Sequence, residues 1–190
     1  MKINNPTATL KSSFLSCEKD AETIIKKLFV SSGQNSNDLK RLLVINAKDC
    51  LDNPNQKYDE EMSKCSVKEL LEGKYITLVP RIQLKEHSEV QNHIILSFDQ
   101  FTETLNPEYR DCIVAFDILC HTECWDLGDY RMRPLKIAGI IDGLLNNAKL
   151  SGIGQLTFLS CNQLVLNEEL SGYSLLYVAT HGADDRLSGD

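Results

Sequence analysis

The sequence lacks the features that would place it in a membrane, send it for export or bind it to nucleic acid. It has no run of about 18 apolar residues, so we expect no membrane-spanning segment. Residues 1–6 lack the apolar stretch and the small-residue cleavage site of a secretion signal. Its lysines and arginines do not cluster as they do in phosphate-binding surfaces, so we expect no sequence-specific nucleic-acid binding.

The motifs of several common enzyme classes are missing as well. The chain contains no P-loop, no nucleophile elbow and no H-E-x-x-H sequence. Gly152 and Gly154 lack the third glycine of a dinucleotide-binding loop, and they follow a predicted helix instead of opening one. The sequence therefore predicts no catalytic residues and no cofactor.

Cysteine is present in an odd number, seven, and without an export signal we expect reduced thiols. The densest group is Cys120-His121-Thr122-Glu123-Cys124, with C-x3-C spacing and no second short-spaced pair. A zinc site would need Cys161 and His181 to complete it. Along a strand, Cys120 and His121 would point to opposite faces. We therefore predict no metal site.

Two thiol–imidazole pairs are conceivable, Cys124 with His121 and Cys161 with His181. A reactive thiolate needs an electropositive setting, whereas the residues around Cys124 are acidic and would raise its pKa. The stretch from His181 onward is polar and near the end of the chain, so it is interpreted as a solvated tail or an intersubunit contact. A small intracellular thiol- or zinc-dependent enzyme stays open as an alternative function.

Charge is distributed unevenly along the 190 residues, whose formal net charge is −7. Residues 1–73 are neutral overall, and residues 74–190 carry the whole excess. An acidic surface is one that DNA can pass without sticking, because like charges repel.

The order of predicted elements favours the α+β class, with about five antiparallel strands, one main helix packed across them and N-terminal helices. We expect an extended arm at 1–15 and a helical part at 16–73 that contains a charged loop at 46–65. A β-β-β-α-β-β core is expected at 74–181, followed by a flexible tail at 182–190.

Helix signals are clear at three places. An apolar stripe follows Asp20, which could cap the helix start. Ser66 and Glu69 match a capping box. The main helix is expected at 133–148, with Pro134 in its first turn. Gly139 and Gly143 are interpreted as a notch that lets this helix approach the sheet. The predicted stripes consist of Ala21, Ile24, Ile25 and Leu28 in the first helix and of Ile137, Ile141, Leu144, Leu145 and Ala148 in the main one.

Strand signals occur in five segments. Residues 75–79, 93–98 and 112–120 are expected to form an antiparallel meander. Residues 155–165 and 173–180 are expected to form the last two strands.

The segment that joins the third strand to the main helix holds the candidate subunit interface. It contains the lone tryptophan, Trp125, and the arginines Arg131 and Arg133. Arginine at a helix start opposes the helix dipole, so a stabilising role is not expected. Tryptophan with arginine is the composition of an interface anchor. The alternative is a capping Trp125 with solvated arginines.

The order of elements over about residues 18–180 resembles the tail-terminator and head–tail joining (neck) proteins of tailed bacteriophages. The resemblance rests on the acidic turn at 121–129, which leads into the helix segment 137–145. The insertion at 46–73 departs from the family pattern. The resemblance implies a virion structural protein that forms a ring, a hexamer or a dodecamer, around the DNA channel. Its partners would be copies of itself and neighbouring neck or tail proteins, in the host cytoplasm during assembly and then in the virion. A monomeric protein-binding adaptor is the remaining alternative.

Overall fold

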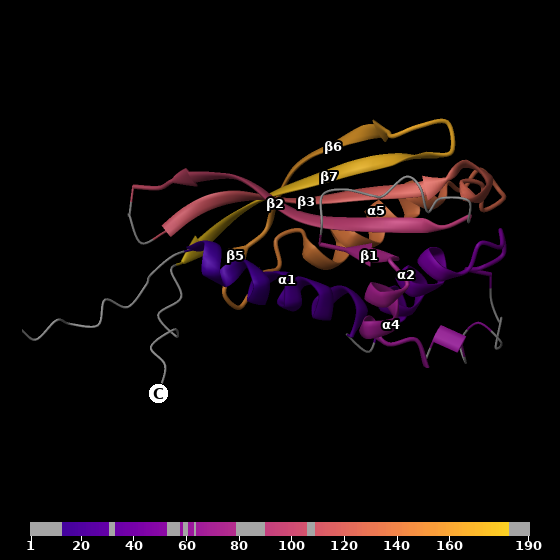
Figure 1. The fold of residues 1–190 in the computed structure, drawn as a ribbon, viewed down its shortest axis with the longest axis horizontal. Coiled ribbons are helices and arrows are strands. Elements are labelled where there is room, and N and C mark those ends of the chain that lie inside the picture. Colours follow the sequence, from indigo (N-terminus) through magenta and orange to yellow (C-terminus); the bar gives the residue numbers. More distant parts are fainter. Residues whose placement is uncertain are drawn as a thin grey trace, which may run out of the picture.

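The computed structural model describes residues 13–30, 33–52, 58, 61–62, 64–78, 90–105 and 109–182. It shows a layer of helices against one twisted β-sheet (Figure 1). The α+β prediction is confirmed. Residues 1–12 of the predicted arm, part of the predicted loop at 46–65 and residues 183–190 of the predicted tail lie outside the described residues. None of the described helices is long and apolar enough to cross a bilayer.

The main sheet has five strands in the order β1-β2-β3-β7-β6. Two long antiparallel pairings dominate it, β2 with β3 and β3 with β7. The antiparallel strand β6 forms one edge beside β7. The strands are β1 (Ile76–Thr77), β2 (Asn92–Glu103), β3 (Tyr109–His121), β6 (Thr157–Val165) and β7 (Leu170–Gly182).

The predicted antiparallel meander is wrong in its first strand. β1 has only two residues, and it pairs in parallel with β2 at Ile94 and Ile95. Because β1 and β2 run in the same direction, a tight turn cannot join them. A second, smaller sheet pairs β4 (Lys149–Leu150) with β5 (Gly154–Gln155) on either side of a turn at residues 151–153.

Helices α1, α2 and α4 come before the sheet, and α1 begins earlier than its sequence signal. α1 spans Ser13–Phe29, so Asp20 lies inside the helix and is buried instead of capping it. α2 spans Gln34–Val44. α4 spans Val67–Glu72, and its capping box is formed: Ser66 Oγ accepts from the Glu69 amide.

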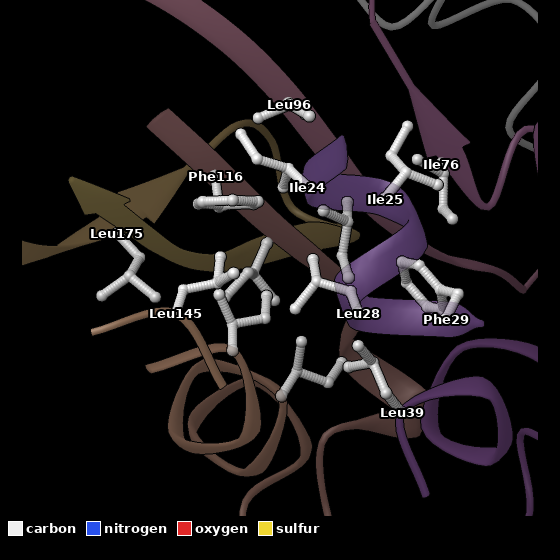
Figure 2. Close-up of a cluster of buried hydrophobic side chains, with 14 of the residues drawn as sticks. Ile24, Ile25, Leu28, Phe29, Leu39, Ile76, Leu96, Phe116, Leu145 and Leu175 are labelled. Atoms are coloured by element: carbon white, nitrogen blue, oxygen red, sulfur yellow. The ribbon is translucent and has the colours of Figure 1, made fainter. Parts of the chain in front are cut away.

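The core lies between the helices and one face of the sheet (Figure 2). The predicted stripe of α1 is buried and faces inward with Phe29, and it meets side chains from α2 and the strands. Figure 2 labels Leu39 of α2, Leu96 of β2, Phe116 of β3 and Leu175 of β7 around the same centre. The helical part and the sheet thus share one hydrophobic core.

α5 spans Arg133–Leu145 and packs on β3 and β7. Ile137, Ile141 and Leu145 of its predicted stripe are fully buried, and Pro134 lies in the first turn. The helix ends three residues before Ala148, because Asn146 leaves the helical conformation.

The predicted glycine notch is wrong. Gly139 and Gly143 are exposed, and a Cβ built at either position has no neighbouring atom within 4 Å. The two glycines therefore point away from the sheet and leave part of the outer surface of α5 without side chains.

Because both glycines lie in open space, we expect Gly139→Ala and Gly143→Ala to stabilise the protein. Alanine is favoured over glycine in an exposed helix interior by about 1 kcal/mol. Chemical denaturation would measure the gain, and the two gains should add because no shared contact links them. A loss of stability in either variant would mean that a neighbouring atom does approach that glycine.

Candidate assembly surface

The three residues predicted to form a subunit interface lie in the connection between β3 and α5. This connection starts with a short 3-10 helix, Thr122–Cys124, and continues through a turn at 126–132. In the turn the Gly128 amide donates to Asp126 Oδ1 at 2.7 Å. Because Gly128 has a φ of +76°, this turn is one that favours glycine.

Arg133 is not a surface residue. Its side chain is 0% exposed, and its guanidinium donates to backbone carbonyls of two separate segments. Nε donates to Cys124 O at 2.7 Å, and Nη1 donates to Leu42 O and Ile45 O at 2.7 and 2.8 Å. Nη2 donates to Asn46 O and Ala47 O at 3.2 and 2.9 Å. All five N–H donors of the guanidinium therefore have acceptors.

The prediction of an intersubunit contact by Arg133 is thus corrected. The carbonyl groups that it binds belong largely to the last turn of α2 and to the loop that follows. These groups form the negative end of the α2 dipole, where a cation is favourable. Arg133 opposes the dipole of its own helix but complements that of α2. Its role is to join the helical part to the start of α5.

Trp125 and Arg131 also make contacts within the chain. The Trp125 indole N–H lies 3.3 Å from Cys120 O and 3.2 Å from Ser171 O, and its ring lies 6.4 Å from that of Tyr173. Arg131 Nη2 donates to Asp52 Oδ1 at 3.0 Å and to Leu127 O at 2.9 Å. Both side chains stay partly exposed, so their role at a subunit contact remains a prediction.

The cysteine–histidine group is divided between two environments. Cys120 and Cys124 are buried, whereas His121 is half-buried and accepts from the Glu123 amide at 3.3 Å. Burial raises the pKa of the Cys120 thiol to about 12 and also raises that of Cys124, with the nearby Arg133 guanidinium acting in the opposite direction. Cys161 is exposed on β6, and the side chain of His181 lies outside the described residues. Within the described ranges, no three His, Cys, Asp or Glu side chains form a group that could hold a metal ion.

Hollows on the surface of the described residues include two that are open and modest in size. One of about 370 Å³ lies between α1 and β2, with Cys17, Ala21, Leu96 and Phe101 in its lining. The other, of about 380 Å³, lies beside α4 and includes Glu61 and Tyr75. Neither brings together a base, a nucleophile and an electrophilic partner, which an acyl- or phosphoryl-transfer site would require.

The exposed edge strand β6 is the surface feature that the sequence did not reveal. Its nine residues, TFLSCNQLV, include no charged residue and no proline. Edge strands of monomeric proteins usually carry lysine or proline, because unpaired backbone N–H and C=O groups otherwise recruit another strand. Leu159 is 50% exposed and Val165 is 65% exposed. This edge has the properties of a strand that pairs in an assembly.

On its inner side, β6 is fixed by contacts with β7 and with the segment that follows α5. It pairs with β7 along its length, with one irregularity between Phe158 and Ser160. The Phe158 ring packs edge-on against Tyr177 at 6.2 Å, and the Phe158 amide donates to Asn146 Oδ1 at 3.2 Å. Tyr177 in turn donates to Asp142 of α5 at 2.9 Å. The stretch from Ser160 to Val165 is therefore a regular strand on a rigid support.

Comparison with protein families relates this fold to a known family. A family model described as YomW matches residues 36–179, about three quarters of the chain. The chain belongs to the YomW family. The YomW match begins inside α2 and ends inside β7, so it includes α5 and the edge strand β6 and leaves out α1. No curated protein and no solved structure matches the chain.

Proposed function

We propose that this protein is a virion structural protein that assembles with copies of itself into a ring at the head–tail junction or the tail end of a tailed phage. The observation that carries the proposal is the exposed, uncharged edge strand β6, which has a neighbouring strand on one side only and suits pairing with a strand from another subunit. The binding energy would come from backbone pairing and from burial of the exposed apolar side chains of this strand.

The charge of the chain supports the same proposal. A net charge of −7 keeps a ring from holding DNA by its phosphates. It also makes two copies repel one another over most of their surface. A long strip without charge is therefore the place where copies of an acidic protein can meet at the lowest electrostatic cost.

Disruption of the edge tests the proposal. Analytical ultracentrifugation and negative-stain electron microscopy of the full-length protein should show a concentration-dependent oligomer with ring-shaped particles. The double variant Leu159→Lys and Val165→Lys places two cations on the edge, so we expect a shift of assembly to at least tenfold higher concentration.

The matched control is Val30→Lys. Val30 is 61% exposed and directly follows α1, away from β6, so this change should leave assembly unaltered. A wild-type protein that stays monomeric at high concentration, or a β6 double variant that assembles like the control, would refute the proposal.

A further inference from the structure

In the described part of the sheet, β6 is a long edge strand with a neighbouring strand on one side only, and it contains no charged residue. The opposite edge is formed by β1, which has two residues against nine in β6. A partner strand for β6 needs a similar length, no charge and apolar side chains at the same positions. A second copy of β6 meets each of these conditions.

The ends of β6 carry opposite charges. Glu168 and Glu169 are exposed and follow its C-terminal end. At the N-terminal end, exposed Lys149 is the cross-strand partner of Gln155, two residues before β6 begins. An antiparallel arrangement of two copies brings the acidic end of each strand beside the basic end of the other, twice. A parallel arrangement would place like charges together.

We infer that two copies of this chain pair antiparallel through β6 about a two-fold axis close to Cys161 and Asn162. This inference rests on the proposed assembly through the same edge. The pairing would join two five-stranded sheets into one continuous sheet, with the described helices of both copies on the same face. A ring built from such pairs contains an even number of copies. A second, different contact must join one pair to the next around the ring.

Cys161 reports directly on this arrangement. It lies near the middle of β6 and is exposed. With the axis at or one residue from Cys161, the two Cys161 side chains are directly opposite or diagonal across the new strand pair. Such pairs have Cβ atoms about 5 to 8 Å apart. A short bis-maleimide, which alkylates one thiol at each end, can therefore join the two copies.

The first experiment is cross-linking of the full-length protein with this reagent. We expect a covalent dimer in the wild type, its loss in Cys161→Ser and its retention in Cys65→Ser, the control at another partly exposed cysteine. If the wild type assembles through β6 but Cys161 does not cross-link, the two-fold pairing is wrong and the proposed function stands. If β6 plays no part in assembly, both are wrong.

Charge reversal is the second experiment. Lys149→Glu alone, or Glu168→Lys with Glu169→Lys, should weaken dimerisation by about threefold to tenfold in low salt, as the loss of two exposed charge contacts would. The combined variant restores opposite charges at each end and should recover the wild-type dissociation constant. Failure of the combined variant to recover, with all proteins folded, would overturn the antiparallel arrangement.

Discussion

Replacement of Arg133 by methionine is expected to lower the free energy of unfolding by about 4 kcal/mol or more, which makes it one of the two largest effects expected here. The guanidinium donates to five backbone carbonyls, and the side chain is fully buried. Methionine fills much of the volume but donates no hydrogen bond. Buried acceptors left without a donor cost about 1 to 3 kcal/mol each, and part of this loss is recovered if water enters.

The variant Arg133→Lys distinguishes the contribution of the positive charge from that of the guanidinium hydrogen bonds. It keeps the cation at the end of α2 but has three donors on one nitrogen, so it cannot reach carbonyls on both sides. We expect Arg133→Lys to lose most of the stability that Arg133→Met loses. Urea denaturation monitored by Trp125 fluorescence measures both. Lys136→Met, an exposed change on the same helix, should stay within about 0.5 kcal/mol. An Arg133→Met protein within 1 kcal/mol of wild type would contradict this role.

Gly172→Ala is expected to destabilise the protein by about 3 kcal/mol or more, by a different mechanism. Gly172 lies in β7 opposite Leu119 of β3 and Leu164 of β6. A Cβ at this position would overlap the Ile118 carbonyl oxygen and lie 2.9 Å from its carbonyl carbon. Since the obstacle is backbone in the neighbouring strand, no side-chain rotation relieves it, and the β3–β7 pairing must shift.

The same substitution elsewhere in the chain supplies the control. Gly139→Ala and Gly143→Ala meet no atom, and a gain in stability is expected there, so one chemical change should have opposite signs at two kinds of position. Thermal or urea unfolding of the three variants measures the sign of each change in stability. A neutral Gly172→Ala would show that β3 and β7 are farther apart than described.

Local patterns predicted the parts of the fold that depend on near neighbours in the sequence. Ser66 and Glu69 are three residues apart, so their capping box could be predicted and is formed. Ile137, Ile141 and Leu145 recur at helical spacing, and they are buried as expected. The α+β class followed from the order of such segments.

Features that depend on distant residues could not be predicted in this way. The rule that arginine is unfavourable at a helix start considers only its own helix, whereas Arg133 binds carbonyls of Leu42 and Ile45, about 90 residues earlier. Spacing alone does not say whether Gly139 and Gly143 face the sheet or the solvent. The sequence of β6 predicts a strand. Its position at the edge follows only from the strand order, in which β7 pairs with β3 on one side and with β6 on the other.

The attachment of Arg133 to two segments has a consequence for how the molecule comes apart. The end of α2 cannot separate from the start of α5 without the Arg133 guanidinium losing four of its five acceptors at once. The helices before the sheet and the sheet itself should therefore open in a single concerted event, with no stable half-folded species between. Under the proposed function, a free subunit that opens only in this concerted way would keep the apolar face of its sheet covered before assembly.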